Sequence, residues 1–368
     1  NVAVGNNALL ANTIGIQNIA IGSGALSNNT TGNNNVAMGT NALQLNTTGI
    51  DNTGLGDRAL QSTTTGTQNT AVGRIALQNN TTGSSNTAVG RAALGANTIG
   101  TNNTAVGNSA LTANTTGISN TADGANALDS NTIGTSLTAV GNSALTGNTT
   151  GINNTAIGAS SLSGNTVGTQ NVAVGNNALS ANTTGTDNTA VGYNALTANG
   201  TGTSGNTAVE SRALAANTTG FSNLGVGNQA LSANTTGIQN VALGYQALLS
   251  NTTGSNNIAI GANTLDSNTS GTDNTGVGNN VLQSNTTGIR NTGVGESALV
   301  SVTTGGSNIA LGYLAGGTLT TGSGNIYIDA SAGAANEATT TRIGTLQTKA
   351  FIAGIRGVTT TNNNAIAV

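Results

Sequence analysis

A repeat of seventeen residues constrains the fold of this chain more than any other feature of its sequence. Each unit reads Asn-Thr-Ala-Val-Gly, two variable residues, Ala-Leu, two variable residues, Asn-Thr-Thr-Gly and two variable residues. The closing glycine of the first part recurs at Gly5, Gly22 and Gly39 and onward, and the register runs to Asp329, which gives 20 coils. A fixed period of this kind is the signature of stacked repeats. We number the positions of a coil from 1 to 17, beginning at the first Asn.

Seventeen residues are too few for a pair of helices and too many for a single strand. They predict one coil of a parallel β-solenoid, with two short strands and two turns. Thr, Val, Ile and Ala fill the expected strands, while Gly and Asn mark the turns. We therefore expect an all-β fold, a parallel β-solenoid (β-roll) of 17-residue coils. At about 4.8 Å per coil, 20 coils make a rod of roughly 95 Å. One extra residue near Gly205 shifts the start of the next coil by one position. In that coil Glu210 takes the place of the position 5 glycine.

Alternation along the first strand predicts which side chains face inward. Position 4 holds Val4, Ile21 and Met38, so we expect it to point into the coil. Position 3, nearly always Ala or Gly, would then face outward against a neighbouring backbone, which favours an oligomer. A leucine column at position 9 supplies most of the apolar interior. Glycines at positions 5 and 15 predict corners, and asparagines at positions 1 and 12 predict amide hydrogen bonds from coil to coil.

The pattern changes near the C-terminus. We expect residues 1–324 to form a solenoid of about 19 coils, and 325–368 to form the last coil and a β-rich cap or junction. Short strands are predicted at Thr340–Ile343, Ala350–Val358 and Ala365–Val368. Before them, Gly316 stands where Leu is expected, and we interpret this coil as the end of the solenoid.

Two single residues break their columns. Tyr327 replaces the position 3 alanine, so the tight outward contact is expected to open there. Asp123 stands in the apolar position 4. Since a lone buried carboxylate is costly, either the strand is locally shifted or the carboxylate turns to water or polar neighbours, or else it forms an ion site or polar network on an oligomer axis.

Composition excludes several classes of function. The chain has no His and no Cys, so it has no Ser-His-Asp or Cys-His triad, disulfide or zinc site of those ligands. A net charge of −3, with 5% charged residues, argues against nucleic acid as a partner. No apolar run of membrane-spanning length and no signal peptide is present. The chain opens in mid-pattern at Asn1, which we interpret as a mature or truncated piece of a longer protein.

The acidic residues are the candidates for catalytic chemistry in this chain. The pairs Asp51 with Asp57 and Asp123 with Asp129 could in principle serve a glycosidase, but no aromatic sugar platforms accompany them. We predict that the chain is not an enzyme, with no catalytic, cofactor-binding or metal-binding residues and no cofactor.

Two surface motifs leave alternatives open. Asn-x-Thr recurs, as at Asn46 and Asn114, either as a glycosylation acceptor or as turn chemistry, and turn chemistry is favoured. Stacked threonines suggest an ice-binding ladder. Adjacent residues such as Thr47 and Thr48 should point to opposite faces of a strand, however, leaving one outward column and a poor lattice match.

The units Asn1–Gly5, Asn18–Gly22 and Asn257–Gly261 resemble the heads of trimeric autotransporter adhesins. That resemblance implies a left-handed parallel β-roll with three chains side by side. The segments Asn325-Ile-Tyr-Ile, Thr341-Arg-Ile-Gly344 and Phe351–Thr359 are similar to the region preceding the endosialidase-type intramolecular chaperone of tail spikes and tail fibres. This second resemblance implies a chaperone that drives trimerisation and is then cleaved from the C-terminus.

Taken together, these patterns predict an extracellular structural and adhesive fibre, either a surface appendage or a phage-type tail fibre on a virion. We expect a homotrimer that attaches to a cell-surface receptor or glycan, with no nucleic acid partner and no membrane span. The alternatives are the non-catalytic rod of a carbohydrate-active tail spike and an ice-binding solenoid.

Overall fold

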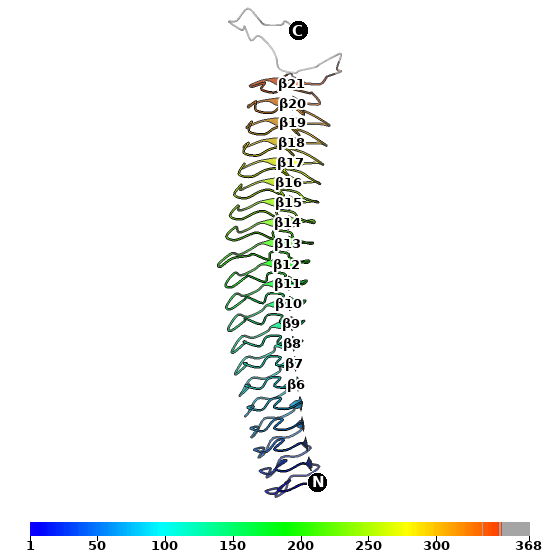
Figure 1. Ribbon diagram of the computed structural model, residues 1–368, viewed down its shortest axis with the longest axis vertical. Coiled ribbons are helices and arrows are strands. Elements are labelled where there is room, and N and C mark those ends of the chain that lie inside the picture. Colours follow the sequence, from blue (N-terminus) through cyan, green and yellow to red (C-terminus); the bar gives the residue numbers. More distant parts are fainter. Residues whose placement is uncertain (333, 346, 348–368) are drawn as a thin grey trace, which may run out of the picture.

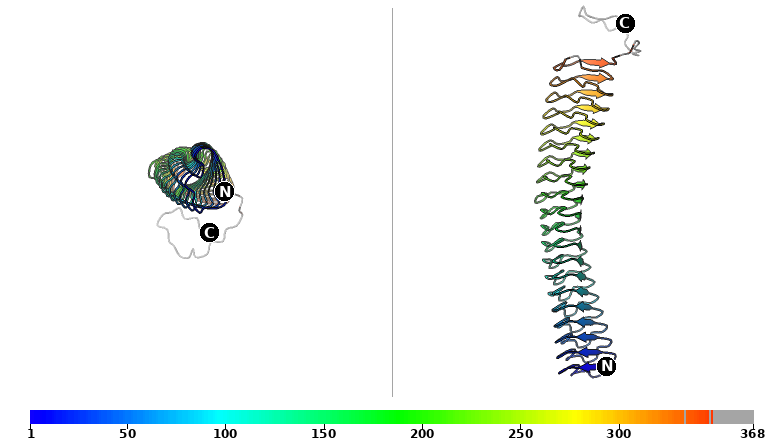
Figure 2. Two further views of the ribbon diagram at one scale, coloured as in Figure 1. Left: turned by 90° about the horizontal axis from the view of Figure 1, so that it is seen from below. Right: turned by 45° about the vertical axis from the view of Figure 1, so that its right-hand side comes forward.

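A computed structural model describes residues 1–332, 334–345 and 347, which form a long, gently curved rod of stacked coils (Figures 1 and 2). Within these residues there is no helix, and each coil contributes one short strand to a single 21-stranded sheet that runs the length of the rod. The N-terminus lies at one end and β21 at the other (Figure 1). The predicted all-β parallel solenoid of 17-residue coils is therefore confirmed.

Every strand is three residues long and covers positions 2 to 4 of its coil, as far as β20. In chain order the strands are β1 Val2–Val4, β2 Ile19–Ile21, β3 Val36–Met38, β4 Thr53–Leu55, β5 Thr70–Val72, β6 Thr87–Val89, β7 Thr104–Val106, β8 Thr121–Asp123, β9 Thr138–Val140, β10 Thr155–Ile157, β11 Val172–Val174, β12 Thr189–Val191, β13 Thr207–Val209, β14 Leu224–Val226, β15 Val241–Leu243, β16 Ile258–Ile260, β17 Thr275–Val277, β18 Thr292–Val294, β19 Ile309–Leu311, β20 Ile326–Ile328 and β21 Thr341–Ile343.

Neighbouring strands are parallel and in strict register. Val36 pairs with Thr53, one repeat further on. Between β12 and β13 the partner of Thr189 is Thr207, which confirms the predicted extra residue. The strand expected at 340–343 is found as β21, whereas those expected at 350–358 and 365–368 lie outside the described residues.

The prediction of which strand side chains face inward was wrong. Position 3 points into the coil, as shown by the fully buried Ala37, and position 4 points out, as shown by Met38, which is 43% exposed. The reason is the narrowness of the interior. At Gly54, an added Cβ would already lie 3.3 Å from the carbonyl oxygen of Ala59 and 3.6 Å from the side chain of Leu43. A column of single methyl groups therefore reflects a narrow interior, not a neighbouring chain.

The leucine half of the coil is not a second strand, which also corrects the expectation. From Leu26 onward the position 9 leucines are fully buried, as predicted, but their backbones are left-handed, with φ of 49° at Leu26 and 50° at Leu43. The amide N–H of Leu26 still donates to the carbonyl of Ala42 in the next coil, at 3.0 Å. The coil can therefore close tightly through a turn while the backbone hydrogen bonds between coils continue.

The two glycine columns mark corners, for two different reasons. Gly39 at position 5 has φ of +140°, which L side chains rarely adopt, and its Cβ would overlap the backbone of Gly56. At position 15, φ is not in this region, but a Cβ on Gly49 would overlap the side-chain oxygen of Asn46. Both predicted roles of glycine, positive φ and close packing, are confirmed.

Two ladders of buried asparagines run along the interior, as the sequence predicted. At position 12, Asn46 Nδ2 donates to Asn29 Oδ1 at 2.8 Å and to the carbonyl of Gly49 at 3.1 Å. At position 1, the backbone N–H of Asn35 donates to Asn18 Oδ1 at 3.0 Å, and its Nδ2 donates to the Gly49 carbonyl at 2.9 Å. These asparagines are fully buried, so each ladder satisfies amides that water does not reach.

The position 12 ladder is broken where another residue replaces asparagine. Thr63 follows Asn46 in the column, and Val302 follows Asn285. The Oδ1 atoms of Asn46 and Asn285 are two of the three buried side-chain polar atoms that have no hydrogen-bond partner among the described residues. Each unpaired oxygen therefore lies at a ladder end, facing the coil that lacks the next amide.

Restoring the missing amide should stabilise the rod. Thr63→Asn keeps the side-chain volume nearly unchanged and gives Asn46 Oδ1 a donor, so we expect a local gain of about 1 kcal/mol. Slower hydrogen exchange at the amides of Leu60 and Thr64 would show it. Thr65→Asn, on the exposed side of the same corner, serves as the control, and equal protection by both substitutions would contradict the ladder explanation.

Removing an amide from the middle of the ladder should do the opposite. Asn148 donates to Asn131 Oδ1 at 2.9 Å and accepts from Asn165 Nδ2 at 2.9 Å. Asn148→Ala leaves buried groups unpaired on both sides, so we expect a local loss of about 2–4 kcal/mol. Hydrogen exchange in the adjacent coils measures this loss. The exposed Asn176→Ala should change little, and a similar loss there would refute the assignment.

Candidate functional site: an exposed apolar strand face

The outer side of the sheet carries two columns of side chains, at positions 2 and 4, and we call this surface the strand face. Position 2 is occupied by β-branched residues and one leucine, with threonine and valine or isoleucine interspersed. Position 4 is apolar in every coil from β1 to β20 except the eighth. Its residues are Val4, Ile21, Met38, Leu55, Val72, Val89, Val106, Val140, Ile157, Val174, Val191, Val209, Val226, Leu243, Ile260, Val277, Val294, Leu311 and Ile328.

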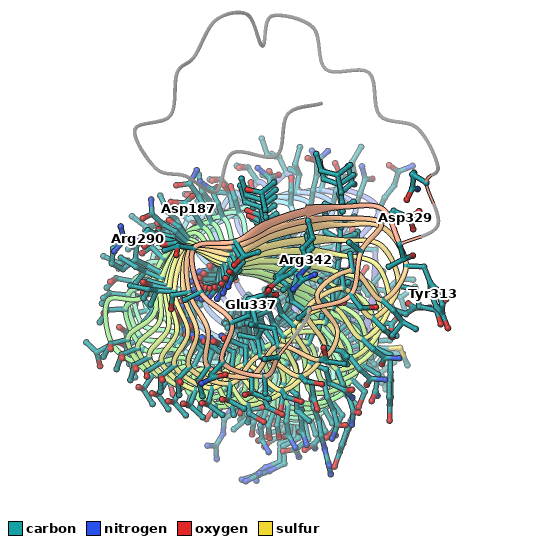
Figure 3. All side chains as sticks on the ribbon, turned by 90° about the horizontal axis from the view of Figure 1, so that it is seen from above. Asp187, Arg290, Tyr313, Asp329, Glu337 and Arg342 are labelled. Atoms are coloured by element: carbon teal, nitrogen blue, oxygen red, sulfur yellow. The ribbon has the colours of Figure 1, made fainter. Side chains whose placement is uncertain are left out.

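The strand face is open along the whole rod. Ile157 is 41% exposed, Leu243 is 45% exposed and Leu311 is 50% exposed. Two columns about 7 Å apart over a rod of roughly 95 Å cover on the order of 600 Å². Threonine occupies position 2 in eleven of the twenty coils, so the continuous apolar part of this area is the position 4 column. Parallel sheets are usually covered on both faces, and exposed apolar surfaces commonly mark contact sites. In Figure 3 these side chains stand on the outside of the stacked strands.

Asp123 interrupts the apolar column of the strand face. It is the position 4 residue of β8, in register with Val106 and Val140. The expectation that it occupies an inward column was wrong, because position 4 faces outward and Asp123 is exposed. The carboxylate is thus turned to water in the single chain, as in the first of the two interpretations.

Threonines at positions 13 and 14 form a second outward surface. Because the backbone bends at Thr47 and Thr48, both side chains of such a pair reach the surface, so the expected single outward column was wrong. The position 13 hydroxyls are occupied, since Thr30 Oγ1 donates to the carbonyl of Thr47 at 3.0 Å and the same bond recurs along the rod. The surface lies on a bend instead of on a flat strand.

The Asn-x-Thr motifs that begin at position 12 prove to be turn chemistry. Asn46 and Asn114 are fully buried. The Nδ2 atom of Asn114 donates to Asn97 Oδ1 and to the Gly117 carbonyl, so the amide nitrogen is already engaged inside the coil. These asparagines cannot carry a glycan in the folded rod.

The acidic pairs singled out from the sequence are separated by the geometry of the coil. Asp51 precedes β4 and Asp57 follows it, so the two lie at opposite ends of the strand. Asp123 is on the strand face, whereas Asp129 lies on the other side of the coil, beyond the leucine column. In the described part of the chain no three His, Cys, Asp or Glu side chains are grouped to hold a metal ion. Nor does that part contain a helix long and apolar enough to span a membrane.

The C-terminal end of the interior is closed by a tyrosine. Tyr327 is fully buried, contrary to the expectation of an opened outward contact. Its ring fills the space above Leu299 that Gly316 leaves free, because a Cβ on Gly316 would lie 2.7 Å from the ring. The column change at Gly316 thus makes room for the ring, and the sheet continues through β20 and β21 instead of ending there.

A short polar network ties this tyrosine to the last strand. Tyr327 Oη donates to Glu337 Oε2 at 3.0 Å, and Arg342 of β21 pairs with Glu337 Oε1 at 2.6 Å (Figure 3). Burial and the Glu337 carboxylate both raise the pKa of the Tyr327 hydroxyl, so it remains a donor at any ordinary pH. Sequence reasoning missed this network, although the joint loss of Leu and gain of Tyr in adjacent coils was its signal.

The chain matches no known protein-family model, and sequence comparison with curated proteins finds no relative.

One acidic side chain, Asp266, is partly buried at an unfavourable site for its charge. Asp266 lies at position 10, and its Oδ1 atom is buried without a hydrogen-bond partner among the described residues. Burial raises the pKa of this carboxyl above its usual value. The folded rod therefore disfavours the charged carboxylate more than the unfolded chain does. The penalty is absent below the unfolded pKa of about 3.8 and grows as the pH rises through the folded pKa.

Asp266→Asn should remove this pH dependence. We expect the variant to have a higher thermal midpoint than the parent chain at pH 7 and little difference at pH 3, because the parent carboxyl is then neutral. Gln283→Asn, at the same position in the next coil, introduces no titrating group and should shift the midpoint equally at both pH values. A D266N effect of equal size at pH 3 would contradict the burial of charge.

Proposed function

We propose that this chain is the rod of an extracellular adhesive fibre in which three copies pack side by side through their strand faces. The observation that supports this is the open apolar column at position 4, which runs from Val4 to Ile328. A single rod leaves that column in water, whereas a complex of parallel rods removes it from water along its whole length.

A second copy of the chain matches this surface better than an unrelated partner. The column repeats at the coil spacing over the full rod, and only another solenoid offers apolar side chains at the same spacing over the same length. Each rod has one such face. Closed rotational symmetry can direct every face toward a shared axis, which leaves none exposed and allows three subunits.

The proposed mechanism is mechanical and not catalytic. Hydrogen bonds between coils run along the rod, so extension loads many of them together. Repeated surface columns offer many weak contacts to a receptor or glycan, and these contacts add through avidity. The likeness to adhesin heads and to the segment before an intramolecular chaperone supports a surface appendage or virion fibre whose chaperone is cleaved after assembly.

Two other functions compete with this proposal. A non-catalytic rod of a carbohydrate-active tail spike would use the same trimer and would differ in carrying a catalytic part elsewhere. An ice-binding solenoid is favoured by the doubled outward threonine columns at positions 13 and 14, but the bend between them and their bonded hydroxyls weigh against it.

The mass of the intact, unheated material in native mass spectrometry tests the assembly. We expect three chains. Val191→Glu combined with Val226→Glu places charges inside the proposed contact and should give a single-chain mass with an unchanged β-sheet circular dichroism spectrum, because unpaired buried charges are costly. Thr150→Glu combined with Thr184→Glu adds the same charges on the threonine corner and should leave three chains.

Three outcomes would contradict parts of this picture. A single-chain mass for the parent material refutes the trimer. A two-chain mass refutes threefold packing while keeping the strand face as the contact. Three chains in V191E/V226E would show that the contact lies elsewhere on the rod.

A further inference from the structure

The aromatic and basic side chains of the solenoid gather on one edge of the rod. Residues 1–324 contain five arginines, three tyrosines and one phenylalanine, and seven of these nine stand at positions 6 and 7, directly after the glycine corner. Two of seventeen positions would receive roughly one of nine by chance. We call these seven residues the arginine–tyrosine edge: Arg58, Arg74, Arg91, Tyr193, Arg212, Tyr245 and Tyr313.

The residues of the edge form a true column. Backbone hydrogen bonds link these positions from coil to coil. The N–H of Ala92 donates to the carbonyl of Arg74 at 3.1 Å, and the N–H of Arg212 donates to the carbonyl of Tyr193 at 2.9 Å. In the same way, the N–H of Ile75 donates to the carbonyl of Asp57 at 2.9 Å. Each step thus joins one coil to the next, about 4.8 Å away. From Arg58 in the fourth coil to Tyr313 in the nineteenth, the edge extends over roughly 70 Å.

The basic end of the edge holds more positive charge than its own carboxylates balance. Arg58 and Arg74 both form ion pairs with Asp57, whose Oδ2 atom lies 3.9 Å from Arg58 Nε and 3.6 Å from Arg74 Nε. Arg91 is stacked one coil beyond Arg74 and has no ion pair among the described residues. Like charges at this spacing repel by about 1 kcal/mol even in water, and an anion bound across them would relieve the repulsion. Two glutamates lie farther along the rod: Glu210 at position 5, beside the edge, and Glu296 at position 6, on the edge.

The tyrosines of the edge are held out into solvent. Tyr193 and Tyr245 are each 52% exposed, and Tyr313 is 65% exposed. They lie three and then four coils apart, which is roughly 14 Å and 19 Å. Beside Tyr245, Gln246 Nε2 donates to Gln229 Oε1 at 2.8 Å, so amides border the rings. Rigid, amphipathic rings next to amides suit the faces and hydroxyl groups of sugars.

The edge stays accessible when strand faces are in contact. Tyr313 projects from one end of the strands, and Asp187 and Arg290 project from the opposite end (Figure 3). Positions 6 and 7 lie past the corner that ends the strand, so they border the strand face without belonging to it. Between packed rods they would line the outer margin of the contact.

We propose that the arginine–tyrosine edge binds an extended anionic polysaccharide along the rod. The arginines take its carboxylate or sulfate groups, and the tyrosines lie under its sugar rings. A narrow edge of this length fits a flexible polymer better than a globular protein. Four arginines spread over many coils, with acids among them, do not match the dense charge of nucleic acid. This inference names the ligand class of the proposed adhesive fibre and so rests on that function.

Binding of the intact material to immobilised polysaccharides tests the edge. The probes are alginate, which carries carboxylates, dextran sulfate, neutral dextran and single-stranded poly(dT). We expect at least one anionic polysaccharide to bind about tenfold or more tightly than neutral dextran. Arg74→Gln with Arg91→Gln should weaken that binding about tenfold, and Tyr193→Ser with Tyr245→Ser about fivefold. Arg290→Gln, an arginine off the edge, should leave it unchanged.

Preference for alginate or for dextran sulfate identifies the anionic group, and either one supports the proposal. The proposal is overturned if neither anionic polysaccharide binds, or if R290Q weakens binding as much as R74Q/R91Q does. Tightest binding to poly(dT) would assign the edge to nucleic acid instead. Native mass is recorded for every variant, so a failed trimer appears as a single-chain mass, whereas a failed ligand assignment appears as lost selectivity at an unchanged mass.

Discussion

The rod depends on its two buried asparagine ladders. In each ladder a side-chain Nδ2 donates to the Oδ1 atom of the N-terminal neighbour, so the amide dipoles point the same way along the stack. In an interior that excludes water, aligned hydrogen bonds polarise one another, and an unpaired group is costly. Each Nδ2 also donates to the position 15 carbonyl of its own coil, which holds the corner of that coil. The ladders therefore fix both the register between coils and the shape of each coil.

This constraint explains where the repeat tolerates change. The single extra residue falls between Asn199, the position 12 member of its coil, and Asn206, the next position 1 member. Both ladders continue across the insertion, since Asn199 Nδ2 donates to Asn182 Oδ1 at 3.0 Å and the N–H of Asn206 donates to Asn188 Oδ1 at 3.1 Å. The insertion lengthens a turn and leaves both ladders continuous, and the buried Thr203 carbonyl accepts from Asn188 Nδ2 where other coils offer a glycine carbonyl. Glu210 then accepts φ of 86° where other coils have glycine, a local strain that the stacked neighbours hold in place.

The fold class could be derived from the sequence because a 17-residue period with Gly, Asn and β-branched residues admits few architectures. The slip near Gly205 and the stacked amides followed from column counting alone. Which strand side chains point inward did not follow from the sequence, because alternation puts positions 3 and 4 on opposite faces without showing which face is inside. A small residue suits a narrow interior and a close neighbour equally. Nor could the left-handed backbone of Leu43 be read, because leucine does not favour that region and only its packing holds it there.

The candidate surfaces were predictable to different degrees for the same physical reason. Interior positions are constrained by contacts in the coil above and the coil below, so a residue change there leaves a visible trace, as Thr63 and Gly316 do. Outer positions are free of that constraint, and their residues vary from coil to coil. The apolar residues of position 4 are therefore informative, because they form an exposed column held to Val, Ile, Leu or Met over nearly every coil. The interior of Leu and Ala is thin, so a contact that buries this column adds apolar stabilisation that the single rod lacks.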